Sequence, residues 1–142
     1  MPSQLNWIAR TAVFACRKEN NYMPKTFDEI QKSFVARAKV SGAKTNNPVV
    51  VAMVGVTGAG NSTLARAFKK LTGWDTIEKN KIRVALREKG RGFTPQKTDQ
   101  IHYAVLGKIL KGGGNAILDS DFAEKSKRRK LERFARHFRA RV

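Results

Sequence analysis

The spacing of apolar residues changes several times along the chain, and each change predicts a new element. The run Val49–Val54 is apolar without alternation, which indicates a strand buried on both faces, as in a parallel sheet. Directly after a glycine-rich stretch, Leu64, Phe68 and Leu71 recur at i, i+4 and i+7. This spacing predicts an amphipathic helix over 62–71 whose apolar stripe is formed by these three side chains.

Further changes in apolar spacing predict strands and helices up to the end of the chain. Short runs at 74–78 and 116–119 predict two more strands. Helices are predicted over 80–88, from Thr94 and Pro95 to the glycines at 112–114, and around Leu131 to Phe138. The order β-α-β-α-α-β-α predicts an α/β fold with a parallel sheet.

Two more helices are predicted before the first strand. The first has a candidate N-cap at Ser3, and the second has a capping sequence at 26–29. A polar linker over 41–48 follows them. We therefore divide the chain into an N-terminal helical extension with its linker, 1–47, and a core domain, 48–142. The helical spacing that predicts these two helices is formed by Leu5, Ile8, Ala12 and Cys16, and by Phe27, Ile30, Phe34 and Ala38.

Composition narrows the class of protein. The chain has 142 residues and a single cysteine, Cys16, which excludes an intramolecular disulfide framework and suits a reducing, cytoplasmic location. No continuous apolar stretch approaches the length of a membrane-spanning helix, and the N-terminus lacks the pattern of a signal peptide. The formal net charge of +18 predicts a polyanionic partner, an anionic substrate, or both.

The strongest chemical signal lies between the first core strand and its helix. Residues 55–63 read GVTGAGNST, which is the phosphate-binding loop pattern G-x-x-x-x-G-K-[ST] with asparagine in the lysine position. Glycines let the backbone wrap closely, its N–H groups cradle an anion, and the helix N-terminus adds positive potential. The hydroxyl of Ser62 would ligate Mg²⁺ on the β- and γ-phosphates. The residues expected at the nucleotide are Gly55, Thr57, Gly58, Ala59, Gly60, Asn61, Ser62 and Thr63.

The asparagine changes what the loop can do. A lysine ammonium is a point charge for the β- and γ-phosphates, whereas Asn61 can donate a hydrogen bond but brings no charge. We therefore expect weak phosphate binding and poor γ-phosphoryl transfer.

A second signal is the basic segment at 124–142. It has two interpretations, a solvated helical face and a nucleic-acid footprint, and both stay open from the residues alone. The residues that would meet a nucleic acid or another polyanion are Lys125, Lys127, Arg128, Arg129, Lys130, Arg133 and Arg136.

From Val49 onward the chain resembles the P-loop small-molecule and polynucleotide kinases, most closely the AAA_33/zeta-toxin-like group and more weakly the adenylylsulfate kinases. Three segments carry the resemblance: VVVAMVGVTGAGNSTLARAF, NKIR at 80–83, and GFTPQKTDQIHYAVLGKILKGGGNAILDSDFAEKSKRRKLERFA. The resemblance implies a three-layer α/β/α P-loop NTPase fold and phosphoryl transfer from ATP·Mg²⁺ to a hydroxyl acceptor. It places Asp119 beside the metal together with Ser62, and Arg83 beside an anionic acceptor.

The chain also departs from this family. Asn80 stands where the family has the aspartate that orients or deprotonates the acceptor, and an amide is no general base. Asp121 replaces a threonine after the third strand. The resembled fold has a further strand, an arginine-rich lid helix and a final strand after the position of Val142, so the resemblance implies a sheet that is incomplete at its C-terminal end. We expect an open sheet edge beside the first or third strand, which could pair with another copy of the chain.

Two functions therefore follow from the sequence. One is an ATP-binding, P-loop kinase-like domain, weak or inactive, in which Asn80, Arg83 and Asp119 occupy the catalytic positions. The alternative is a basic nucleic-acid-binding module on a degenerate P-loop scaffold.

Overall fold

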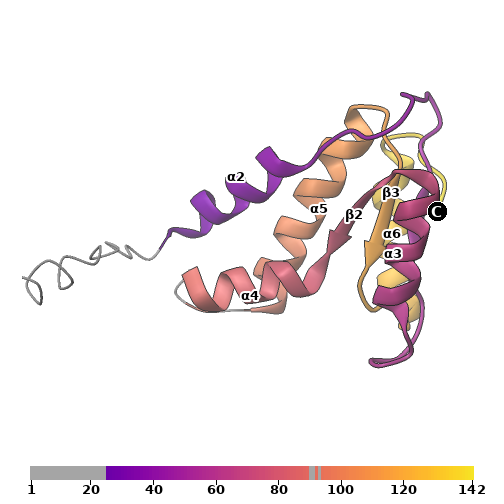
Figure 1. Cartoon of the computed structure of the whole chain (residues 1–142). Coiled ribbons are helices and arrows are strands. Elements are labelled where there is room, and N and C mark those ends of the chain that lie inside the picture. Colours follow the sequence, from indigo (N-terminus) through magenta and orange to yellow (C-terminus); the bar gives the residue numbers. More distant parts are fainter. Residues whose placement is uncertain (1–24, 90–91, 93) are drawn as a thin grey trace, which may run out of the picture.

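The computed structural model describes residues 25–89, 92 and 94–142 and is drawn in Figure 1. The first predicted helix, with Ser3 and Cys16, lies outside the described residues. The five described helices are α2 (Phe27–Arg37), α3 (Asn61–Thr72), α4 (Lys79–Lys89), α5 (Pro95–Lys111) and α6 (Lys125–Arg136). The three strands are β1 (Val50–Ala52), β2 (Asp75–Glu78) and β3 (Ala116–Asp119). The predicted α/β class and the order of elements are confirmed.

The three strands form a parallel sheet in the order β1-β3-β2. Of the two positions predicted for an open edge, the third strand is excluded because β3 lies in the middle, whereas the first strand, β1, is an edge strand, as is β2. The outer edge of β1 is partly occupied, because the backbone of Arg141 bonds to both neighbours of Val49: Val50 N donates to Arg141 O and Arg141 N donates to Pro48 O, each at 2.8 Å.

Helices cover both faces of the sheet, which gives the expected three layers. On one face, α3 packs through Ala65 and Phe68 against Met53 and Ile117 (Figure 1). On the other face, α5 and α6 enclose the larger core, in which Leu106 and Leu131 are fully buried. Alternating side chains of β3 reach both layers, because successive side chains of a strand point to opposite faces.

The face that α3 turns toward the sheet differs from the predicted one. Leu64 and Leu71 are 57% and 85% exposed, whereas Ala65 is 1% exposed and Phe68 is half-buried. The helix begins at Asn61 and packs through Ala65 against Met53 and Ile117, which sets the face that it turns toward the sheet. Two large apolar side chains therefore lie on the surface, and small Ala65 allows close packing on β3.

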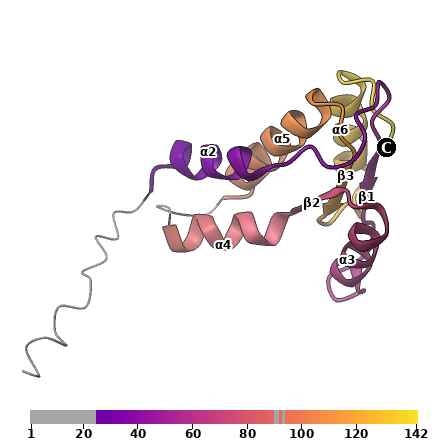
Figure 2. The same ribbon diagram turned by 45° about the horizontal axis from the view of Figure 1, so that its top comes forward.

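The described part of the N-terminal extension shares the core. Ile30 of α2 is 1% exposed and belongs to the same cluster as the buried residues of α4 and α5. The predicted capping box is present, with Thr26 accepting from Glu29 N and Glu29 accepting from Thr26 N. Figure 2 shows α2 lying along α5 and α4. The domain boundary at 47/48 stays a prediction.

Local sequence signals also account for α5. Thr94 caps its N-terminus by accepting from Lys97 N, and Pro95 occupies the first turn, where a missing N–H costs nothing. At 17 residues, α5 is the longest described helix, and none of the described helices has the length and apolar character needed to cross a membrane.

Candidate functional site

The phosphate-binding loop leaves the sheet at the carboxyl end of β1. Ala52 pairs with Leu118, and Glu78 of β2 pairs with Asp119 of β3, so all three strands end at one edge. Met53 N still donates to Leu118 O at 3.1 Å before the chain turns away. Ligands of parallel α/β sheets bind beyond this edge.

The loop itself depends on two glycines in left-handed conformation. Gly58 and Gly60 both have φ of 87°, which other L-residues adopt only with strain. A turn closed by Ala59 N donating to Val56 O, at 3.1 Å, precedes the helix. Gly60 then serves as the N-cap of α3 without a side-chain hydrogen bond, and the first turn of α3 has no acidic residue. The helix therefore offers its first N–H groups and its positive potential to an anion.

Asn61 lies folded back across the loop. Its Nδ2 donates to Gly55 O at 3.4 Å, and a Cβ placed on Gly55 would lie 2.9 Å from its Oδ1. A Cβ at position 55 would therefore have to displace this amide. The amide uses its donor on the loop wall, so the position contributes no charge to the phosphate region.

The remaining expected site residues surround the same edge. Thr57, Ser62 and Thr63 are exposed on the loop and the first turn of α3. Asp119 ends β3 and is half-buried, and the next residue, Ser120, has a buried hydroxyl without a hydrogen-bond partner among the described residues. The adjacency of β1 and β3 brings the loop and Asp119 to neighbouring strand ends.

The two expected acceptor-side residues lie on α4, directly after β2. Asn80 is the second residue of the helix, Arg83 follows three residues later, and both are exposed. Residues three apart lie on one helical face. Since Glu78 pairs with Asp119, the start of α4 stands beside the end of β3.

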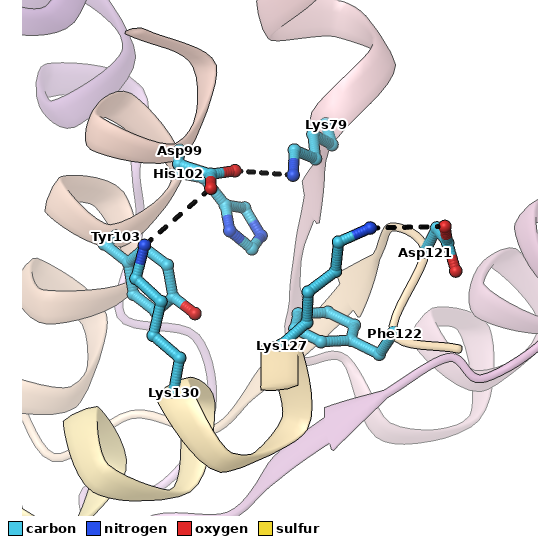
Figure 3. A pocket seen from close by; sticks show the side chains of 8 residues that line it. All are labelled: Lys79, Asp99, His102, Tyr103, Asp121, Phe122, Lys127 and Lys130. Carbon is cyan, nitrogen blue, oxygen red and sulfur yellow. Dashed lines mark ion pairs between the residues drawn. The ribbon is translucent and has the colours of Figure 1, made fainter. Parts of the chain in front are cut away.

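A small pocket, which the sequence analysis missed, lies beside this edge and is shown in Figure 3. Lys79 pairs with Asp99 at 2.5 Å, and Lys130 lies 3.8 Å from the same carboxylate. His102 is 2% exposed, and its Nε2 has no hydrogen-bond partner among the described residues. The pocket is lined by Lys79, Asp99, His102, Tyr103, Asp121, Phe122, Lys127 and Lys130.

Burial and charge set the protonation states in this pocket. Burial, and then the positive charge of Lys79, lowers the pKa of His102 to about 4, so the imidazole is neutral near pH 7. Burial and the charge of Asp99 raise the pKa of Tyr103 to about 12. Burial acts to raise the pKa of Asp99, but the hydrogen bond and charge of Lys79, with the charge of Lys130, bring it below its ordinary value.

The spacing of three polar residues in the sequence could have indicated this pocket. Asp99, His102 and Tyr103 are spaced i, i+3 and i+4, which places them on one face of α5. The lysines that meet these side chains come from other elements, so their approach could not be predicted from the sequence of α5.

A family model described as AAA domain, AAA_33, matches residues 50–142, which is most of the chain and includes the loop, both acceptor-side residues and Asp119. No curated protein matches the chain. With a parallel sheet flanked by helices and a glycine loop at its carboxyl edge, the chain belongs to the AAA_33 family of AAA domains, a P-loop nucleotide-binding family.

Proposed function

We propose that the chain binds the phosphates of ATP·Mg²⁺ on residues 55–63 and transfers the γ-phosphoryl group weakly or not at all. The observation that supports this most is the start of α3. Gly60 is left-handed, no side chain caps the helix, and no carboxylate stands in its first turn. An uncapped helix N-terminus after a glycine loop favours a phosphate ligand.

The residues present also fit a magnesium ion. Ser62 offers a hydroxyl at the first turn of α3, and Asp119 offers a carboxylate at the neighbouring strand end. Hard oxygen ligands of this kind suit Mg²⁺, which keeps several waters and binds phosphates. When bound, the ion would neutralise charge on the phosphates.

Two asparagines favour slow phosphoryl transfer. Asn61 supplies no charge where phosphoryl transfer needs it, and its amide donates to Gly55 O. Asn80 cannot accept a proton from an acceptor hydroxyl. Arg83, one turn along α4, remains exposed and could meet an anionic acceptor.

A comparison of two glycine variants tests the phosphate site. Gly60 and Gly42 both have φ of 87° and open space where a Cβ would lie, but only Gly60 belongs to the loop. An L-residue in this conformation costs roughly 1–2 kcal/mol, so both substitutions impose similar local strain. We expect Gly60→Ala to weaken ATP·Mg²⁺ binding at least tenfold in calorimetric titration, and Gly42→Ala to leave it unchanged. The proposal would be contradicted if the unmodified chain gave no heat of binding at millimolar ATP·Mg²⁺. Equal affinities for the two variants would contradict it as well.

The basic residues of α6 favour a second function, nucleic-acid binding, which uses a different surface of the same scaffold.

A further inference from the structure

Apart from the exposed Lys125 in the first turn, the basic side chains of α6 fall into two groups. One group is engaged within the fold: Lys127 pairs with Glu124 at 2.9 Å, Arg128 donates to the carbonyls of Phe122 and Ala123, and Lys130 lies over the Tyr103 ring at 5.0 Å. These charges are already compensated or directed inward. They are therefore poor candidates for contacts with a partner.

The second group points away from the core. Arg129, Arg133 and Arg136, here called the arginine stripe, are spaced by four and three residues and so share one helical face. All three are exposed, and within the described part of the chain none of their guanidinium groups has an ion pair or a hydrogen bond. The opposite face carries Leu131 and Ala135, which are both 0% exposed.

The stripe lines a shallow groove along the outer side of α6, together with Ser126 and Glu132. Its three guanidinium groups extend over about 10 Å of helix, and Glu132 offsets one of the three charges. Guanidinium is a planar fork that binds phosphate oxygens in pairs, which makes arginine well suited to phosphate recognition.

We propose that the arginine stripe binds the phosphodiester backbone of a nucleic acid. The net charge of +18 attracts any polyanion to the chain, and the stripe supplies a row of guanidinium donors that have no ion pair among the described residues. Contacts of this kind position a backbone without reading its sequence. Since the stripe carries no aromatic side chain for base stacking, we expect little sequence preference.

An anionic membrane is the less favoured partner. Helices that lie on membranes insert an apolar face beneath their basic residues. In α6 the apolar face is used by the core, where Leu131 is fully buried and the tilted rings of Phe134 and Tyr103 lie 4.9 Å apart between centroids. The helix that carries the stripe, α6, lies on the opposite side of the sheet from α3, as Figures 1 and 2 show.

A charge-matched pair of variants tests the proposal on the full chain. Arg129→Ala/Arg133→Ala/Arg136→Ala removes the stripe, and Arg66→Ala/Lys69→Ala/Lys70→Ala removes three exposed charges from α3. Anisotropy of a labelled oligothymidylate and of a labelled DNA duplex is followed over a salt series. We expect the stripe variant to bind at least tenfold more weakly and to flatten the log–log salt slope by about 2 on single strands or about 2.7 on duplex. The α3 variant should lose less than threefold.

The variant Arg129→Lys/Arg133→Lys/Arg136→Lys keeps the three charges and should retain most of the salt slope. This result would show that the alanine variant binds weakly because it has lost phosphate contacts and not because it has unfolded. Equal losses in the stripe and α3 variants would overturn the proposal, because net charge alone would then explain binding. Absence of binding at low salt would also overturn it. So would stripe-dependent binding to phosphatidylserine vesicles without binding to nucleic acid.

Discussion

Acidification should destabilise the fold through His102. The imidazole is 2% exposed and lies against Tyr103 and Phe122, with Lys79 and Lys130 opposing its protonation and Asp99 favouring it. Its pKa falls from 6.5 to about 4 on folding, so between these values the unfolded chain binds the proton and the folded chain does not. Stability linked to this group is therefore present above pH 6.5 and is lost as the pH falls toward 4.

The size of the effect follows from the two pKa values. Between pH 7 and pH 5 the imidazole should lower the free energy of unfolding by about 2 kcal/mol. Asp99 adds little within this window, because its ordinary pKa of 3.8 lies below it and the folded value is lower still. The other charged groups at the pocket, Lys127 and Asp121, stay charged over the same range.

Urea denaturation at several pH values, with the wild type and His102→Phe, measures this contribution. Phenylalanine fills similar space beside two aromatic rings and removes Nε2, which has no hydrogen-bond partner among the described residues. We expect the wild type to lose about 2 kcal/mol more than the variant between pH 7 and pH 5, with equal denaturant slopes. Parallel pH dependence of the two proteins would refute the argument that a neutral, buried imidazole is the acid-sensitive group.

Two further predictions test the packing and the chemistry. Leu131→Ala should destabilise the fold by about 2–5 kcal/mol, whereas Leu71→Ala, at an 85% exposed position, should change stability by less than about 0.5 kcal/mol in the same denaturation assay; comparable losses would contradict the observed face of α3. Neither Asn61→Lys nor Asn80→Asp alone should give substantial phosphoryl transfer from labelled ATP to a panel of hydroxyl acceptors, because each leaves the other deficit in place; robust turnover by the unmodified chain would show that neither asparagine is limiting.

Local signals explain why much of the fold could be predicted. Thr26 and Thr94 cap their helices as the sequence indicated, and the run Ala116–Asp119 forms the strand predicted for it. These features depend on neighbouring residues in the chain. The glycine loop was found for the same reason, since its spacing reflects one strand-to-helix turn.

Properties that depend on contacts between residues far apart in the sequence could not be predicted. The sequence of β3 does not indicate that this strand lies between the other two, because the crossovers that join parallel strands allow several strand orders. The rotation of α3 depends on the packing of Ala65 against β3, so Leu64 and Leu71 were wrongly assigned to the buried stripe.

The same limitation applies to charge. Lys130 and Arg129 are adjacent and equivalent in the sequence, yet only Lys130 meets the carboxylate of Asp99. His102 likewise shares its pocket with Lys79, which comes from the start of another helix. Burial and pairing across elements determine which ionisable groups belong to a site.

The central claim is that residues 55–63 form a phosphate site weakened by the uncharged Asn61. Calorimetric titration of ATP·Mg²⁺ into the wild type and Asn61→Lys tests it most directly. Restoring the ammonium adds a charge-assisted contact of roughly 1.5–3 kcal/mol, so we expect weak binding by the wild type and at least tenfold tighter binding by the variant. Equal affinities for the two proteins would contradict the claim and show that the loop does not hold the phosphates.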